Sequence, residues 1–206
     1  MESKISNWWL IRHAPVLQKT LYGQLNVAAD YSDEGTFAWL AEHLPKDARW
    51  ITSDLDRCIK TATKILDVAN LSDISAISCA ALREQNFGKW QGFSYAEIEQ
   101  QDPEFYRDFW KDPACNQPPE GESFDDVMTR VRSVPADFQK QEHSQNNVVV
   151  AHAGSIRALT AWALDLSPNA ALRLEIAPLS YTKLTLYEKN GEQSWQVSCL
   201  NRICTA

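Results

Sequence analysis

Four short apolar runs, widely spaced along the chain, are the feature that most constrains its fold. They span residues 7–12, 49–53, 74–79 and 147–151, and each is rich in β-branched or aromatic side chains. Runs of this length and composition are typical of strands that are buried on both faces. Between them, apolar residues recur at helical spacing through 55–69 and 123–141. Strands that alternate with helices predict a mostly parallel sheet with helices on both sides.

The C-terminal part of the chain has a different pattern. The stretches "ALRLEIAP" (171–178), "YTKLTLYEKNGE" (181–192) and "SWQVSCL" (194–200) alternate apolar and polar residues around an Asn-Gly turn. Such alternation predicts antiparallel strands, and Asn-Gly favours the tight turn of a hairpin. We therefore expect a mixed sheet within a three-layer α/β/α sandwich.

The chain has 206 residues, of which 44% are hydrophobic, and this suits one domain over 1–206. The interval 94–122 combines helical pieces and aromatic residues with the irregular loop "DPACNQPPEGES" (112–123). We expect this interval to be an insertion that roofs a pocket. Its aromatic residues Phe105, Tyr106, Phe109 and Trp110 could face a flat ligand, although their helical spacing favours packing against one another.

The formal net charge of −7 argues against a nucleic-acid or membrane-surface binder. No apolar run approaches the roughly 18 residues of a membrane helix, and no signal peptide is visible, so we expect a cytoplasmic protein. The five cysteines have no metal-type spacing, which favours free thiols over disulfides or a zinc site. The sequence is compatible with a homodimer.

Two of the apolar runs end on a histidine. His13 follows Arg12 in "LIRHAP", and His152 follows "VVVA" just before a helical pattern. In an open α/β sheet, ligands bind beyond the carboxyl ends of the strands, so the two histidines could meet at one site. A single histidine in this position could simply cap its strand. Two equivalent histidines favour a functional site.

An arginine and a glutamate could join the histidines at the same edge of the sheet. Arg57 opens the helical pattern after the second apolar run, and Glu84 follows the third. Guanidinium groups suit phosphate, because they donate parallel charge-assisted hydrogen bonds. A neutral histidine nitrogen can attack phosphorus, and a carboxylic acid can protonate the leaving oxygen. Considered singly, without the two histidines, Arg57 would be interpreted as a solvated surface charge and Glu84 as an ordinary exposed loop residue.

Four motifs in order, "LIRHAP", "TSDLDRCIKTA", "LREQNFGKWQG" and "VVVAHAGSIRAL", resemble the histidine phosphatase superfamily, which includes the cofactor-dependent phosphoglycerate mutases. The resemblance implies the phosphoglycerate mutase-like fold and a phosphomonoesterase of the histidine acid phosphatase type. It implies that His13 is the phosphorylated nucleophile and Glu84 the general acid, while Arg12, Arg57 and His152 hold the phosphoryl group. It further implies substrate contacts from Tyr22, Gly23, Gln24 and Ala153.

Within the superfamily, "LYGQLNV" (21–27) and "PPEGES" (118–123) look most like the α-ribazole phosphatases of cobalamin assembly. We therefore expect a small phosphorylated metabolite as substrate. We expect no metal or other cofactor, because the arginines and His152 already supply positive charge. The alternatives are a cofactor-dependent phosphoglycerate mutase and a phosphate-binding module without catalysis. The short stretch from Glu84 to His152 favours hydrolysis over mutase activity, because mutases carry a longer segment there.

The chain departs from the family pattern at several positions. Ala14 and Pro15 stand where the family has glycine and glutamate, and Ala153 stands where it has glycine. Gln91 replaces the glutamate of a Trp-Glu-Gly motif, and Asn26 replaces an aspartate.

The asparagine with which mutases contact the phosphate is also missing. Lys19 and Gln24 are the candidates to replace it.

Overall fold

The computed structural model describes residues 4–141 and 144–205. Within this part of the chain, six strands form one sheet in the order β3-β2-β4-β1-β5-β6. The strands are β1 (Lys4–Arg12), β2 (Arg49–Thr52), β3 (Ile77–Ser78), β4 (Asn146–Ala151), β5 (Tyr181–Lys189) and β6 (Glu192–Arg202). The strands β3, β2, β4 and β1 run parallel to one another. The strand β5 pairs antiparallel with β1 on one side and with β6 on the other. The expectation of a mixed, mostly parallel sheet is confirmed.

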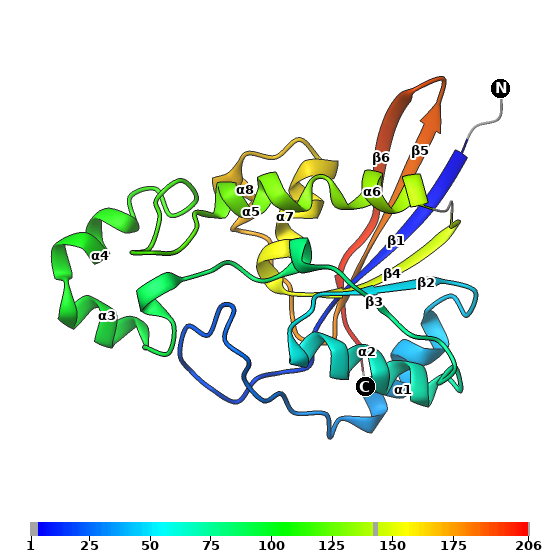
Figure 1. Ribbon diagram of the computed structural model, residues 1–206, viewed down its shortest axis with the longest axis horizontal. Helices are drawn as coiled ribbons and strands as arrows, with labels where there is room; N and C mark the ends of the chain where they lie inside the picture. Colours follow the sequence, from blue (N-terminus) through cyan, green and yellow to red (C-terminus); the bar gives the residue numbers. More distant parts are fainter. Residues whose placement is uncertain (1–3, 142–143, 206) are drawn as a thin grey trace.

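The helices are α1 (Glu34–His43), α2 (Asp56–Val68), α3 (Tyr95–Gln101), α4 (Pro103–Phe109), α5 (Phe124–Val131), α6 (Val134–Gln141), α7 (Ala153–Ala163) and α8 (Pro168–Ala171). In Figure 1, α1 and α2 lie on one side of the sheet and α5, α6 and α7 on the other, whereas α3 and α4 stand apart from it. Two 3₁₀ turns, Ala80–Leu82 and Gly88–Trp90, lie between β3 and α3.

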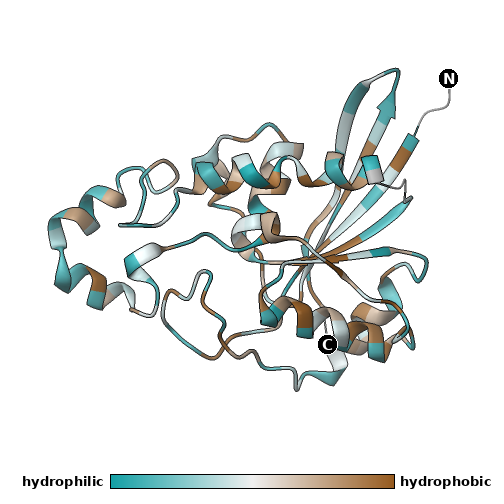
Figure 2. Ribbon diagram, in the orientation of Figure 1, coloured by the Kyte–Doolittle hydropathy of each residue, from teal (hydrophilic) through white to brown (hydrophobic). Residues whose placement is uncertain are grey.

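Alternate side chains of the central strand β4 divide the core in two. Val149 and Ala151 pack with residues of α5 and α7, whereas Val148 and Val150 pack with residues of α1 and α2. This follows from the two-residue period of a strand, which sends successive side chains to opposite faces. Figure 2 shows the hydrophobic residues gathered where the strands cross the centre of the molecule. The three-layer α/β/α arrangement is therefore confirmed.

Some local predictions were wrong. The stretch "ALRLEIAP" forms no strand: it begins in α8 and continues as turns and irregular chain before β5. Its alternation instead reflects burial, because Leu172, Leu174 and Ile176 are less exposed than the two charged residues between them. The third apolar run is a strand over Ile77–Ser78 alone, and the helical pattern of 123–141 is divided between α5 and α6. The Asn-Gly hairpin is confirmed by the pairing of β5 with β6.

Candidate active site

The carboxyl ends of three parallel strands place three polar residues at one edge of the sheet. The backbone N–H of His13 donates to the carbonyl of Ala151, and that of Ser53 donates to the carbonyl of Val150. Both bonds continue the register of β1 and β2 with β4, after which His152 begins the turn into α7. The parallel sheet thus holds His13, Ser53 and His152 side by side. The expected meeting of the two histidines is observed, with ring centroids 5.1 Å apart.

The ring of His13 has a defined tautomer when it is neutral. Its Nδ1–H donates to the carbonyl oxygen of Ala14 over 2.7 Å. Burial, and after it the positive charge of Arg57, lowers the pKa of His13 from its usual value to about 3. The ring is therefore neutral near pH 7, with its proton on Nδ1. The lone pair on Nε2 is left facing Arg57, whose Nε donates to it over 3.2 Å.

Arg57 is the centre of the cluster. It is fully buried, because α2 carries it on the face that packs against the sheet. Besides His13, its guanidinium donates to His152 Nδ1 over 3.1 Å and to the carbonyl oxygens of Gly23 and Leu25. The guanidinium carbon, Cζ, also lies 4.9 Å from the centroid of the Tyr22 ring. The loop over 22–25 is therefore wrapped around this arginine.

His152 is also held as a neutral ring. Burial, together with the neighbouring positive charges, lowers the pKa of His152 well below its usual value. Its Nδ1 accepts from Arg57, so its proton lies on Nε2 and points to the hydroxyl oxygen of Ser53, 2.9 Å away. The buried thiol of Cys58 lies 3.3 Å from the same nitrogen, and burial raises the pKa of Cys58. Cys58 is consequently a neutral neighbour of the ring.

Arg12 adds positive charge with spare hydrogen-bonding capacity. Its Nη1 donates to the carbonyl of Ile176 over 2.6 Å. Its Nε is buried and has no hydrogen-bond partner among the described residues. Buried N–H groups are rarely left without a partner, and an oxyanion bound at this edge would supply one.

Glu84 lies against the first turn of α7. Its carboxylate accepts from the backbone N–H of Gly154 over 3.0 Å and from that of its neighbour Gln85 over 3.0 Å. Since Gly154 follows His152 by two residues, the carboxylate lies beside the histidine cluster. Ala153, the first residue of α7, separates the two. Gln24 joins the group through its Nε2, which donates to the carbonyl of Glu84 over 3.0 Å.

The structure thus brings together the nine residues named as candidates from the sequence: Arg12, His13, Tyr22, Gly23, Gln24, Arg57, Glu84, His152 and Ala153. Lys19, considered as a further phosphate contact, is exposed. The aromatic residues of α4 largely pack together. Phe109 is buried against Trp90, with ring centroids 4.7 Å apart, whereas Trp110 remains 44% exposed.

Sequence reasoning missed two further arginines near the site. Arg157 on α7 interacts electrostatically with Glu84 and Arg12, and its Nε donates to the carbonyl of Leu174. Arg130 on α5 donates to the carbonyl of Glu84 and contributes to the lowered pKa of His152. Arg157 belongs to a quoted motif but received no role there. The position of Arg130 within an amphipathic helix carries no signal of this contact.

Two negative findings concern the described residues alone. Over 4–141 and 144–205, no helix is long and apolar enough to cross a membrane. In the same ranges, no group of three or more His, Cys, Asp or Glu side chains is arranged to hold a metal ion.

Comparisons with known proteins agree with the fold and the motifs. The profile of the histidine phosphatase superfamily (branch 1) matches residues 8–201. The 2,3-bisphosphoglycerate-dependent phosphoglycerate mutase of Bartonella tribocorum is 34% identical over 137 residues, which are 64% of this chain and 66% of the relative. The chain spans between 40% and 66% of the length of the curated relatives compared with it.

Solved structures cover the chain more completely. Mycobacterial glucosyl-3-phosphoglycerate phosphatase has a TM-score of 0.82 and 26% identity, and the match covers 96% of this chain and 99% of that one. The α-ribazole phosphatase from Shigella flexneri has a TM-score of 0.80 and 21% identity, with 97% and 99% covered. At that identity the second likeness speaks for the fold alone.

Proposed function

The chain belongs to the histidine phosphatase superfamily, and from this premise we propose that it hydrolyses phosphomonoesters through a phosphohistidine intermediate on His13. One observation carries the proposal. Because the Nδ1–H of His13 donates a hydrogen bond to the Ala14 carbonyl, the lone pair of the ring lies on Nε2 inside a cluster of arginines. A phosphate bound to Arg57 would take over the hydrogen bond that Arg57 Nε donates to this nitrogen, which frees it as the nucleophile.

In the first step, a phosphomonoester binds with its phosphate against Arg12, Arg57 and His152. Nε2 of His13 forms a bond to phosphorus while the bond from phosphorus to the ester oxygen breaks. The guanidinium groups stabilise the charge on the transferring phosphoryl group. Glu84, in its protonated form, gives its proton to the leaving oxygen, so that an alcohol departs.

In the second step, water attacks the phosphohistidine. The carboxylate of Glu84 takes a proton from the attacking water, a P–O bond forms, and the bond from phosphorus to Nε2 breaks. Inorganic phosphate is released, and His13 and Glu84 return to their starting protonation states. Both steps use His13 and Glu84, with the phosphoryl group held by Arg12, Arg57 and His152, which supports a single site.

For the substrate we propose a ring-bearing phosphomonoester, with α-ribazole 5′-phosphate as the first candidate. The stretches "LYGQLNV" and "PPEGES" support this choice. So does the pair of exposed rings of Tyr95 and Trp110, whose centroids are 5.8 Å apart. Tyr95 also interacts electrostatically with Glu84 and Arg157, which supports a place for the segment 94–122 over the site. The glucosyl-3-phosphoglycerate named for the mycobacterial relative is a second ring-bearing candidate.

The nucleophile can be tested by labelling. A ³²P-labelled phosphomonoester should transfer acid-labile, base-stable label to the wild-type protein within one turnover. His13→Ala should abolish both the label and turnover, because it removes the nitrogen that bonds to phosphorus. His43→Ala is the matched control, since His43 lies exposed on α1. Normal labelling of His13→Ala would show that the nucleophile is wrongly assigned.

The same assay over a panel of metabolites tests the substrate. We expect a higher kcat/KM for α-ribazole 5′-phosphate or another ring-bearing ester than for 3-phosphoglycerate. Interconversion of 3- and 2-phosphoglycerate would instead make the protein a mutase, and phosphate binding without turnover would make it a binding module.

A further inference from the structure

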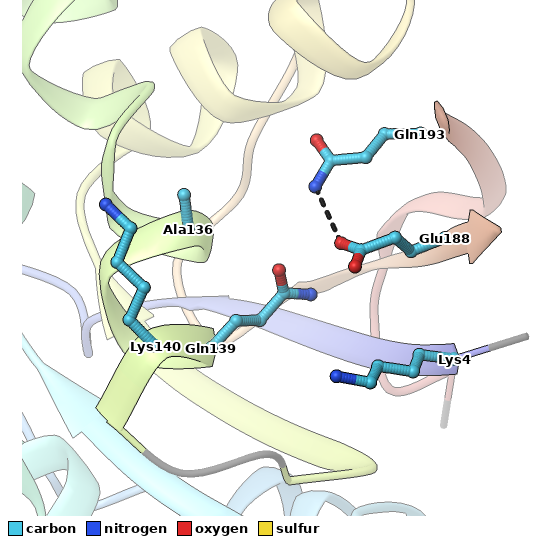
Figure 3. Close-up of a pocket in the computed structure, with 6 residues that line it drawn as sticks. All are labelled: Lys4, Ala136, Gln139, Lys140, Glu188 and Gln193. Carbon is cyan, nitrogen blue, oxygen red and sulfur yellow. Dashed lines mark hydrogen bonds between the residues drawn. The ribbon is translucent and has the colours of Figure 1, made fainter. Parts of the chain in front are cut away.

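The cavity shown in Figure 3 lies away from the histidine cluster, between α6 and the β5–β6 hairpin. Its charged lining consists of surface side chains, Lys4, Lys140 and Glu188, and it gives no sign of a particular ligand. The turn "PPEGES" (118–123) is more informative. It contributes no group to the chemistry proposed above, yet it contacts the segment that carries Glu84.

Backbone pairing joins this turn to the chain that follows Glu84. The N–H of Glu122 donates to the carbonyl of Asn86 over 2.8 Å, and the N–H of Lys89 donates to the carbonyl of Pro119 over 2.9 Å. The approach is so close that a Cβ atom at Gly88 would lie 2.0 Å from the Pro119 oxygen. Gly88 also has a φ of +51°, which glycine adopts readily. The turn and the segment therefore form one rigid unit.

A charge pair anchors this unit to α5. Arg130 Nε and Nη2 donate to the two carboxylate oxygens of Glu122 over 3.1 Å and 2.8 Å. The two side chains are only 23% and 18% exposed. Such bidentate pairs fix geometry more strictly than a single contact does. The arginine then extends the unit toward the active site: Nη2 also donates to the carbonyl of Glu84, and Nη1 donates to the carbonyl of Ala81.

Glu122 holds a second part of the site. Its Oε1 also accepts from the backbone N–H of Asn86 over 2.8 Å and from Gln24 Nε2 over 3.4 Å. Gln24 lies in the loop that wraps around Arg57 and itself donates to the carbonyl of Glu84. One carboxylate thus links the loop around the phosphate-binding arginine to the segment of the general acid.

From these contacts we infer that Glu122 and Arg130 are positioning residues, which fix the main chain of Glu84 so that its carboxylate stays beside the leaving oxygen. The inference rests on the proposed role of Glu84 as general acid. Neither residue touches the reacting atoms. They act on the reaction rate by positioning Glu84, and their effect on the rate is largest when the leaving group needs a proton.

The test compares two substrates in the full-length protein. Glu122→Gln removes the charge but keeps the side-chain shape, and Arg130→Lys keeps the charge but loses the fork of donors. Each should lower kcat on an alkyl phosphate by about 10- to 100-fold, since a small misplacement of a catalytic group has costs of this order. On p-nitrophenyl phosphate, whose phenolate leaves without a proton, the loss should stay below about threefold.

The matched control is Asp126→Asn on the same helix. Asp126 accepts from the backbone N–H and hydroxyl of Ser123 in the cap of α5 and has no hydrogen bond to the Glu84 segment. This variant should weaken α5 and leave the ratio of the two rates unchanged. Thermal unfolding of all variants shows whether lost stability explains any fall in rate.

A double variant separates positioning from a general structural role. In the background of Glu84→Gln, Glu122→Gln should have no further effect on the alkyl phosphate, because the group that it positions is already disabled. Equal losses on both substrates, or full additivity with Glu84→Gln, would overturn the inference. Failure of the proposed function has a different signature, in which Glu84→Gln alone slows both substrates equally.

Discussion

Two residues that depart from the family pattern, Gln91 and Ala14, make hydrogen bonds to the segments that carry the site. Gln91 stands where the family has glutamate, and its Oε1 accepts from the backbone N–H of Gln24 over 2.7 Å. An amide oxygen serves for this bond as a carboxylate oxygen would. Ala14 acts through its main chain, which donates to Thr61 Oγ1 and accepts from His13 Nδ1. The position is fully buried, so a small side chain is what it requires.

The close approach of Gly154 to the Glu84 carboxylate leads to a specific prediction. A Cβ atom added there would lie 2.1 Å from Glu84 Oε1, which is far inside contact distance. Gly154→Ala should therefore push the carboxylate out of place and lower the rate on an alkyl phosphate by about 10²-fold or more. Steady-state kinetics on alkyl and p-nitrophenyl phosphates measure this effect.

Gly35 provides the matched control for that substitution. It is the second residue of α1, as Gly154 is of α7, and an added Cβ would meet only Asp33 Oδ1 at 3.6 Å. Gly35→Ala should leave both rates unchanged and raise the free energy of unfolding by about 0.4–1 kcal/mol. If Gly154→Ala were as active as Gly35→Ala, the carboxylate would have no role at its observed place.

Among the elements, α2 matters most, because its second residue is Arg57. Its N-cap residue Leu55 offers no side-chain acceptor. The cap comes from a distant part of the chain: Asn26 Oδ1 accepts from the backbone N–H of Asp56 over 3.1 Å. This explains why asparagine can replace aspartate here, since either side chain has an oxygen that caps a helix.

Removing this cap should affect both stability and phosphate binding. Asn26→Ala should lower the free energy of unfolding by about 1 kcal/mol, and it should weaken binding of inorganic phosphate, because the end of the helix that holds Arg57 is loosened. Asn26→Asp should preserve both properties. Urea unfolding and calorimetric titration with phosphate give the two values.

Asp33→Ala is the control for an ordinary cap. Asp33 accepts from the backbone N–H of Thr36 at the start of α1, away from the histidine cluster. It should show a similar loss of stability with unchanged phosphate affinity. Unchanged affinity in Asn26→Ala as well would mean that the cap does not position Arg57.

For the molecule as a whole, the site concentrates positive charge within a chain of net charge −7. Arg12, Arg57 and Arg130 each contribute to the lowered pKa of His152. Two neutral histidines lie buried in the same place. The folded protein therefore resists protonation of a site that the unfolded chain would protonate readily.

This arrangement predicts how stability depends on pH. The pKa of His13 is about 3 in the folded protein and about 6.5 when unfolded, and that of His152 is lowered in the same direction. Below about pH 6.5 the unfolded state binds more protons, so the free energy of unfolding should fall by about 1.4 kcal/mol per pH unit for each histidine. Above about pH 6.5 both histidines are neutral in the folded and the unfolded state, so they no longer lower the free energy of unfolding.

Urea unfolding at about pH 7.5, 6.5 and 5.5 measures this slope before most carboxylates titrate. His13→Asn should reduce the slope by the contribution of one proton, about 1.4 kcal/mol per pH unit, since it removes one of the two neutral rings. A stability that is constant down to about pH 5 would contradict the neutral, buried state of the histidines.

The layers of the fold and the carboxyl ends of β1 and β4 could be predicted from the amino-acid sequence alone. Hydrophobic periodicity is local, so the apolar runs predicted β1, β2 and β4. The ordered motifs singled out His13, Arg57, Glu84 and His152 as candidates, and the structure brings these residues close together. Periodicity failed where tertiary packing sets the outcome: "ALRLEIAP" alternates like a strand, but it packs Ala171, Leu172 and Ile176 against the core without forming one.

The hydrogen-bond partners of most site residues are set by the tertiary structure. The contacts of Arg57 with His13 and His152 span 44 and 95 residues, and that of Arg130 with the Glu84 carbonyl spans 46. The tautomer of His152, the cap that Asn26 gives to α2 and the link through Glu122 depend on such distant pairs. A hydrogen bond requires a particular distance and direction between two atoms, and for residues this far apart in sequence only the packed sheet and helices fix both.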